Sequence, residues 1–246
     1  GKKFDLNYIY IQKGGQRDHN ASDKIKTLVH CVYPQKFKEI HGYKYIFISE
    51  WLSKKISNKK IPSVPYIVKL HKTKENLKKK LNIKKNQIVF GCHGGESSFD
   101  LRFVHQTLLE IVKKRKDVFF LFLKIKKFCN HPRIIFLKGT FDEAYKKKFI
   151  NTCDAMIYGR SLGESFGLAC AEFSIQGKKI ISYKFNRHKS HIYNLSKSNF
   201  IEYSSRKDLF NILNNFNKKQ SINLNKNNKY LDFSPTKVMK IFNKVF

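Results

Sequence analysis

Short, unbroken apolar runs recur along the chain, and stretches with helical periodicity separate them. Continuous rather than alternating apolar runs are typical of strands that are buried on both faces of a parallel sheet. Nine such runs are strand candidates: residues 7–12, 27–32, 43–48, 87–92, 118–123, 134–137, 155–158, 179–183 and 200–203. Because helical patterns lie between them, the sequence predicts βαβ units and a parallel α/β fold.

Several of the intervening segments carry helix start or stop signals. The candidate N-terminal caps, whose side-chain oxygens can accept from the first turn, are Ser49, Thr73 and Asp142, and a longer helix is expected to begin at Asp100. Residues 168–176 are expected to form a helix that ends at Gly177, and Ser234 with the proline after it opens the last helix. Pro62 and Pro65 lie between a short first sheet and a more regular second one, which places a domain boundary there.

The charge is strongly positive: 50 lysine and arginine residues against 18 acidic ones give +32. Such a chain attracts polyanions, including nucleic acid and an anionic membrane surface. The basic residues, however, occur as short runs between apolar elements, which is typical of solvated faces. Since no RNA-binding or zinc-finger pattern is present, no specific nucleic-acid partner is expected. A non-catalytic polyanion-binding module on a Rossmann-like scaffold remains an alternative.

Cysteine usage and hydropathy predict the compartment. The five cysteines are scattered, without CxxC or Cys/His ligand spacing, so we expect free thiols and no structural zinc. No apolar run approaches the ~18–20 residues that span a membrane. We therefore expect a soluble, cytoplasmic protein, with an anionic membrane surface as a candidate peripheral partner.

Two glycine-containing turns follow strand candidates, where open α/β sheets bind ligands. In the first, GCHGGESSFD, Gly94 and Gly95 allow close approach of the backbone to an anion, although a tight strand-to-helix turn explains them equally well. The second occupies residues 153–181 and is the most informative stretch of the chain. Neither is G-x-G-x-x-G or a Walker loop, which argues against NAD enzymes and P-loop kinases.

The second turn joins a strand to a helix that begins near Gly167. Backbone N–H groups at Ser165, Phe166 and Gly167 would then lie at a helix N-terminus, where a diphosphate is favoured. Glu164 and Glu172 frame this turn with E-x7-E spacing. Carboxylates accept hydrogen bonds from sugar hydroxyls well. Alternatively, Glu164 caps local backbone and Glu172 pairs with a nearby lysine.

The segment ESFGLACAE, with CDAMIYGRS before it and glycine and KKIIS after it, resembles the E-x7-E motif of the GT4 family of retaining glycosyltransferases. The resemblance covers about 30 residues, and a weaker one extends through residues 136–155 and back to the GCHGG turn. The shared motif positions are Asp154, Arg160, Glu164, Phe166, Gly167, Glu172 and Gly177.

This resemblance implies a GT-B fold, with two Rossmann-like domains of parallel sheets and a reduced first domain. The implied parts are an acceptor-side domain at residues 1–70, a donor-binding domain at 71–230, and a helix at 231–246 that packs back toward the first. The implied reaction moves a hexose from a GDP-mannose or UDP-glucose type of donor to a glycan or other hydroxyl acceptor. It proceeds with retention and without a metal or cofactor.

The resemblance also implies roles for residues. Glu164 would bind hydroxyls of the transferred sugar and Glu172 those of the ribose. Donor contacts are further implied at the backbone of Ser165, Phe166 and Gly167, at Gly94 and Gly95, and near the nucleobase at Thr140 and Phe141.

Departures from the family pattern bear on catalysis. The family commonly has Arg and then Lys after the first strand of the donor domain, where this chain has Cys92-His93 and Ser97-Ser98. The cation for the diphosphate must come from elsewhere. Arg160 is our first candidate, with Lys124, Arg102 and His93 behind it.

From the first domain, Gly14 and Gly15 could approach the donor across the cleft. His30 and His41 could touch sugar or acceptor, although each could equally be a core or surface histidine. Glu164, Arg160 and His30 are thus the predicted catalytic residues.

Overall fold

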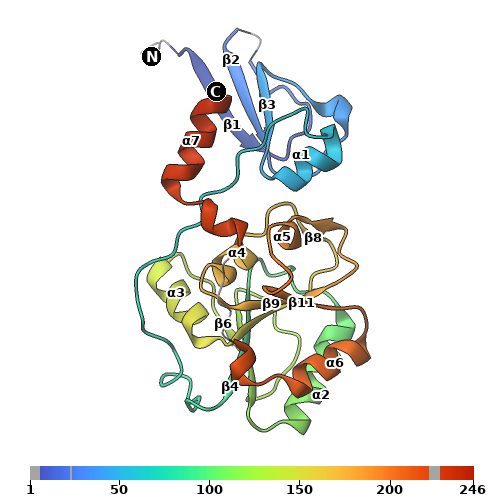
Figure 1. Ribbon diagram of the computed structural model, residues 1–246, viewed down its shortest axis with the longest axis vertical. Coiled ribbons are helices and arrows are strands. Elements are labelled where there is room, and N and C mark those ends of the chain that lie inside the picture. Colours follow the sequence, from blue (N-terminus) through green and yellow to red (C-terminus); the bar gives the residue numbers. More distant parts are fainter. Residues whose placement is uncertain (1–5, 23, 222–227) are drawn as a thin grey trace.

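A computed structural model describes residues 6–22, 24–221 and 228–246. Two parallel sheets lie one above the other along its long axis, each in its own part of the molecule (Figure 1). The first sheet has three strands in the order β1 (Tyr8–Lys13), β2 (Lys26–Cys31), β3 (Lys44–Phe47), followed by helix α1 (Glu50–Ser57).

The second sheet has six strands in the order β11-β9-β7-β4-β5-β6. Their bounds are β4 (Ile88–His93), β5 (Val118–Leu123), β6 (Ile134–Leu137), β7 (Ala155–Tyr158), β9 (Lys179–Tyr183) and β11 (Phe200–Tyr203). From β4 the chain builds outward to β6, and from β7 it builds the opposite way to β11. The strand order therefore reverses between β4 and β7, and ligands of open parallel sheets bind at the carboxyl ends of the strands flanking such a point.

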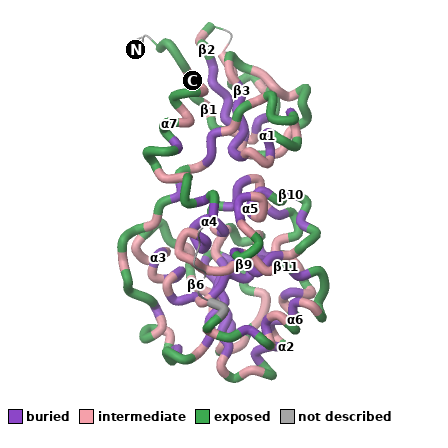
Figure 2. The backbone as a smooth tube through the Cα atoms, viewed as in Figure 1, coloured by how far each residue is buried: buried purple, intermediate pink, exposed green. Residues whose placement is uncertain are grey.

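Helices cover this sheet on both faces. They are α2 (Arg102–Lys114), α3 (Glu143–Thr152), α4 (Leu168–Ser174), the single turn α5 (Ser190–Tyr193) and α6 (Arg206–Asn215). The described residues also form three 3₁₀ segments: η1 (Phe37–Glu39), η2 (Lys218–Ser221) and η3 (Lys229–Asp232). Figure 2 shows that the buried chain follows the central strands, and β5 is buried throughout its length.

The apolar runs predicted the strands well, and the predicted α/β class with two Rossmann-like sheets is confirmed. All nine runs form strands within one residue of the expected bounds, because each is a local apolar signal that the core then uses. The short parallel pair β8 (Gly163–Glu164) and β10 (His188–Lys189) was not predicted, since two residues carry no periodicity.

The helix starts were predicted less evenly. Ser49 caps α1 by accepting from the Leu52 N–H at 3.2 Å, and Asp142 caps α3 by accepting from Ala144 and Tyr145. The helix expected from Asp100 is present as α2 and begins at Arg102, while the Asp100 carboxylate accepts from the backbone N–H and hydroxyl of Ser161, each at 2.7 Å. Helix α6 was not predicted, because its two buried leucines, Leu209 and Leu213, lie among several asparagines that weaken the helical pattern.

The helix expected after Thr73 is wrong. The first bond of such a helix would join the Leu77 N–H to the Thr73 carbonyl. Instead, Leu77 donates to the Thr152 hydroxyl at 2.8 Å, and the Thr73 carbonyl accepts from the Asn151 amide at 3.0 Å. Both partners come from α3, so tertiary contacts satisfy the groups that a helix would have used.

The last helix, α7 (Pro235–Val245), returns to the first sheet (Figure 1). Its Val238 packs with Ile46 and Val64, and its Phe242 ring lies 5.6 Å from that of Tyr10. The segment just after Pro62 still pairs with β3, so the chain crosses between the sheets after Val64. The exact domain limits stay predictions. In the described residues, every helix is too short or too polar to cross a bilayer.

Candidate functional site

A pocket of about 360 Å³ lies where the strand order reverses, between the loop after β4 and the loop after β7. Its lining residues are Cys92, His93, Gly94, Gly95, Ser98, Lys146, Tyr158, Arg160, Glu164, Leu168, Ala169 and Glu172. Six of them were predicted from sequence: His93, Gly94, Gly95, Arg160, Glu164 and Glu172. The two glycine turns and the E-x7-E pair therefore meet in one place.

Glu164 is held by two donors from its own loop. Its Oε1 accepts from the Tyr158 hydroxyl at 2.9 Å and from Arg160 Nη1 at 3.0 Å. Burial, reinforced by the charge of Glu164, raises the pKa of Tyr158 well above its ordinary value, so this hydroxyl stays a donor. Among the described residues Oε2 accepts no hydrogen bond, and the side chain is 24% exposed. One oxygen is thus fixed by protein, which leaves the other for a ligand.

Glu172 is more deeply buried and sits between two basic groups. Its Oε1 lies 2.7 Å from Lys146 Nζ, and its Oε2 lies 2.9 Å from His93 Nε2. Burial alone would raise the pKa of Glu172, but His93 and Lys146 outweigh it, so the net pKa is lowered. Glu172 is a carboxylate at neutral pH and pairs with a lysine, the second of the two roles considered for it.

Lys146 was not singled out from the sequence, because it is one of three consecutive lysines. The structure separates them: Lys148 pairs with Glu75 and Lys147 contacts Gln176, whereas Lys146 lines the pocket. Its contacts with Glu172 and Glu143 outweigh burial and raise its pKa, so it is a cation. The pocket therefore contains two firm positive charges, Lys146 and Arg160, against two carboxylates.

The Gly94–Gly95 turn leaves space at its tip. A Cβ built at Gly95 would meet no atom within 4 Å, whereas one at Gly94 would lie 2.3 Å from the Ser98 hydroxyl. The Gly94 N–H is already used, since it donates to the Leu123 carbonyl at 3.3 Å. Gly95 is thus the position at which this backbone is open to a ligand.

Ser165, Phe166 and Gly167 lie beside the pocket rather than in its lining. The Ser165 carbonyl accepts from the Ser49 hydroxyl at 2.6 Å, which links the motif loop to the cap of α1. The Phe166 ring is buried against Tyr66 and Tyr230. This stretch therefore joins the two parts of the molecule, a role that the motif alone did not predict.

The candidates from the first sheet lie outside the pocket. His30 is buried: it accepts from the Tyr10 hydroxyl at 2.5 Å and donates to the Val64 carbonyl at 2.9 Å. Burial lowers the pKa of His30 to about 4, so it is neutral at pH 7. With both ring nitrogens occupied inside the first domain, His30 has the geometry of a core histidine, and we withdraw the catalytic role.

Gly15 packs inward, whereas Gly14 is half-buried. Gly15 has a φ of +102°, and a Cβ there would lie 2.1 Å from Cys31 Sγ and 2.6 Å from the Tyr45 hydroxyl. Close packing thus explains Gly15, while a Cβ at Gly14 would closely approach only the end of the Gln16 side chain, so a donor contact at Gly14 stays a prediction. His41 contacts the Glu39 carbonyl and lines a separate cavity, described below.

Lys124, Thr140 and Phe141 follow β5 and β6, at the same edge of the sheet as the pocket but outside its lining. Lys124 is exposed, and Thr140 accepts from the Asp142 N–H at 2.9 Å. Phe141 is fully exposed. An apolar ring with no protein cover at this edge has the surface needed to stack against a flat ligand.

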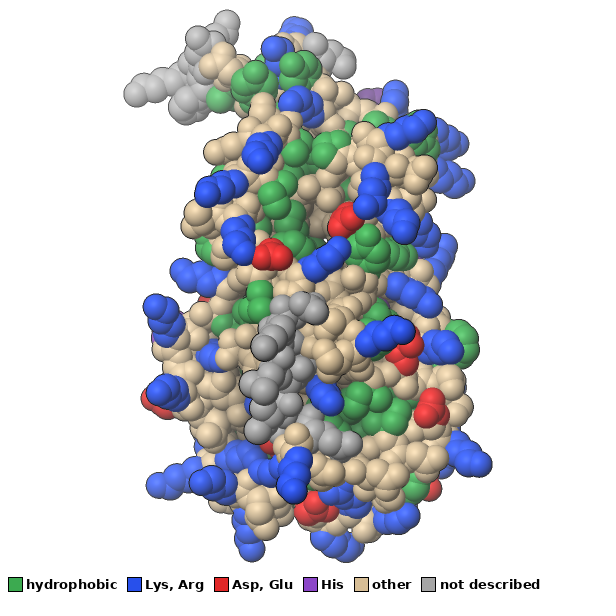
Figure 3. Space-filling model, in the orientation of Figure 1, with side chains coloured by type: hydrophobic (Ala, Val, Ile, Leu, Met, Phe, Trp, Pro, Cys, Tyr) green, Lys and Arg blue, Asp and Glu red, His purple; other side chains and the backbone are tan. Residues whose placement is uncertain are grey.

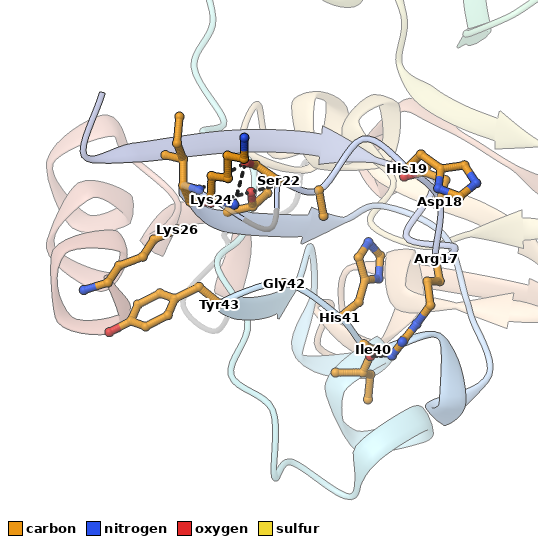
Figure 4. Close-up of a pocket in the computed structure, with 13 residues that line it drawn as sticks. Arg17, Asp18, His19, Ser22, Lys24, Lys26, Ile40, His41, Gly42 and Tyr43 are labelled. Carbon is orange, nitrogen blue, oxygen red and sulfur yellow. Dashed lines mark hydrogen bonds between the residues drawn. The ribbon is translucent and has the colours of Figure 1, made fainter. Parts of the chain in front are cut away.

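A larger cavity, about 870 Å³, lies in the first domain (Figure 4). It is built from the loop before β2 and the turn before β3, away from the carboxyl ends of those strands. Two of its charged groups already have partners: Asp18 pairs with Lys13, and Arg17 donates to the Ile40 carbonyl at 2.8 Å. We therefore place the candidate site in the smaller pocket at the switch point.

No family model matches the sequence, and a search of curated proteins found no match either. Solved structures do match. HepE of Anabaena, determined with UDP and glucose, aligns at a TM-score of 0.68 and 13% identity, covering 90% of this chain and 70% of HepE. TarM of S. aureus, determined with fondaparinux, alpha-GlcNAc-glycerol and UDP, aligns at 0.64 and 10% identity, covering 91% of this chain and 51% of TarM.

Sucrose-phosphate synthase of Thermosynechococcus elongatus aligns at a TM-score of 0.59 and 13% identity, covering 89% of this chain and 64% of the synthase. At these identities the likeness defines the fold. The chain has the GT-B architecture of these glycosyltransferases, with a three-stranded first sheet, as the sequence predicted. It is also shorter than these proteins, spanning about half of TarM and 70% of HepE.

Proposed function

We propose that this protein transfers a hexose from a nucleotide-diphosphate sugar to a hydroxyl of a glycan or another acceptor. The observation that carries the proposal is Glu164: its Oε1 is fixed by Tyr158 and Arg160, and its Oε2 has no partner in the described residues, in a pocket at the switch point. A carboxylate so held can accept a pair of sugar hydroxyls. The UDP and glucose bound to HepE, and the UDP bound to TarM, support this class of ligand.

The roles of the other pocket residues follow from their charge and position. Arg160 and Lys146 would offset the charge of the departing diphosphate, and the open backbone at Gly95 would let it approach. Glu172 would accept a ribose hydroxyl beside its lysine partner, since a carboxylate has about four acceptor sites. Phe141, with Thr140 beside it, would lie against the nucleobase.

We further propose transfer with retention and without a metal or cofactor. Both details rest on the E-x7-E resemblance. The cations of the pocket itself also support transfer without a metal. The first donor to test is UDP-glucose, because UDP is bound in both HepE and TarM, with GDP-mannose as the competitor.

Calorimetric titration with UDP, GDP and ADP at about 0.15 M salt tests the proposal. We expect saturable binding of one nucleotide, and UDP release from UDP-glucose that persists in EDTA. A Glu164→Ala variant should fold normally and lose the release. A protein that binds heparin with a steep salt dependence and prefers no nucleotide would instead be a polyanion-binding module. Figure 3 shows lysines and arginines scattered over the visible face rather than gathered in one groove.

A further inference from the structure

Lys147 is an exception among the basic residues of this protein. In the described ranges it is the only lysine or arginine that is buried, with 6% of its surface exposed. Other well-covered lysines pair with carboxylates: Lys13 with Asp18 and Lys146 with Glu172. Lys147 has no carboxylate within 4 Å in the described part of the chain, and its ammonium contacts only the neutral Gln176 Oε1.

An uncompensated buried cation is costly unless something balances it. Burial lowers the pKa of Lys147, and the nearby charge of Lys178 lowers it further. Neither neighbour supplies negative charge. A bound anion would supply the negative charge that these neighbours do not.

Lys147 faces a pocket of about 500 Å³ that is suited to an anion. The opposite wall is the segment that crosses between the domains, which runs beside α3 (Figure 1), and it contributes Lys72, Lys74 and the Thr73 side chain. Among the residues that the structure describes, no acidic one lines this pocket. The pocket at the switch point differs in this respect, because there two carboxylates balance two cations.

The wall is fixed even though it has no regular structure. The Asn151 amide donates to the carbonyls of Thr73 and Glu75, at 3.0 and 2.8 Å, and so ties the segment to α3. The Thr73 hydroxyl oxygen accepts from the Glu75 N–H, which leaves its own hydrogen to donate. Three lysines and a threonine thus line the pocket from two elements that hydrogen bonds tie together.

We propose that this pocket binds a phosphate group, carried by a molecule larger than the ion itself. A phosphate accepts from several donors at once and carries more charge than a carboxylate, which fits three lysines better. The volume exceeds what a single ion would fill. The site lies outside the donor pocket, so the proposal does not depend on glycosyl transfer.

The test is titration of the wild-type protein with inorganic phosphate, with no nucleotide present, at constant ionic strength made up with chloride. We expect saturable binding that Lys147→Met weakens at least tenfold. The exposed pair Lys72→Gln and Lys74→Gln should weaken it similarly, which guards against a folding defect in the buried variant. Lys113→Met, an equal charge change on the exposed end of α2, should bind phosphate like the wild type.

A second arm identifies the source of the phosphate. Glucose 6-phosphate represents a soluble phosphorylated sugar, and vesicles containing phosphatidylglycerol represent a lipid headgroup. Binding of either that depends on Lys147 supports the proposal and assigns the source. If phosphate binds wild type and Lys147→Met equally, or does not bind the wild type above the chloride control, the proposal is overturned.

Discussion

Two glycine pairs occupy equivalent places in the two halves of this molecule, yet only one opens onto a site. Gly14–Gly15 follow β1 and Gly94–Gly95 follow β4, each at the carboxyl end of a parallel strand. A Cβ at Gly15 would collide with Cys31 and Tyr45, whereas one at Gly95 would meet nothing within 4 Å. A glycine pair after a strand therefore indicates that other atoms approach the backbone closely. Whether those atoms belong to the protein core or to a ligand depends on what lies next to the glycine in the fold.

The same contrast extends to the side chains around each turn. The carboxyl edge of the second sheet gathers charged groups, Glu164, Arg160, Lys146 and Glu172, around a pocket. At the same edge of the first sheet, His30 is buried and neutral with both its ring nitrogens occupied inside the domain, and Lys13 already pairs with Asp18. The second sheet holds the candidate chemistry, and the first contributes packing.

Removing the fixed carboxylate should give the largest effect. Glu164→Gln keeps the shape of the side chain but replaces the charged acceptor, and we expect donor turnover to fall by ~10²–10³, as for loss of a preorganised polar group in an active site. UDP release from UDP-glucose is the measurement, with the melting temperature as a check on folding. His30→Gln is the control from the first sheet, and it should leave turnover within a few-fold of wild type. An equal loss of turnover in the two variants would contradict the assignment of the chemistry to the second sheet alone.

Alanine at the second glycine of each pair separates packing from binding. Gly15→Ala should cost about 3 kcal/mol of unfolding free energy, because it adds a methyl group to a filled site at positive φ. Gly95→Ala should leave stability nearly unchanged and weaken UDP binding about tenfold, since the methyl group would point into ligand space. Denaturant unfolding and nucleotide titration of both variants measure this. A Gly95→Ala protein that binds UDP normally would show that the ligand does not approach this turn.

The buried histidine of the first sheet gives the stability of the protein a pH dependence. Burial lowers the pKa of His30 to about 4, against about 6.5 in the unfolded chain, so the folded state favours the neutral ring. This contribution is complete above pH 6.5 and is lost as the pH falls toward 4, amounting to about 2 kcal/mol between pH 7.5 and 5. Denaturant unfolding across that range should show a shallower slope for His30→Gln.

A second histidine must be separated in that experiment. His191, buried in the second domain, has its pKa lowered by burial to about 3 and adds its own loss over the same range. The prediction for His30 is therefore the difference between wild type and variant rather than the whole slope. If the two curves run parallel from pH 7.5 to 5, His30 is not buried as described.

Features that depend on short stretches of sequence were predicted correctly. The strands were found because each apolar run is itself the signal, and the E-x7-E spacing brought Glu164 and Glu172 to one pocket because a strand, turn and helix fix their separation. The failures depend on distant contacts. Lys146, Lys147 and Lys148 are equivalent in sequence and acquire different partners only when Glu172, Gln176 and Glu75 are placed around α3.

The smallest effect we predict concerns the hydroxyl that fixes Glu164. Tyr158→Phe removes one of its two protein donors and leaves Arg160, so the carboxylate stays in the pocket but can turn more freely. A hydrogen bond to a charged group contributes about 1.5 kcal/mol at the low end, and we therefore expect kcat for UDP release to fall about tenfold. UDP affinity should be unchanged, because Tyr158 positions the carboxylate that we propose binds the sugar and does not contact the proposed nucleotide site. Tyr203→Phe, which removes a buried hydroxyl bonded to the Tyr158 carbonyl, is the matched control. It should affect stability with little change in kcat, and a Tyr158→Phe enzyme that differs from wild type only in stability would leave Glu164 positioned by Arg160 alone.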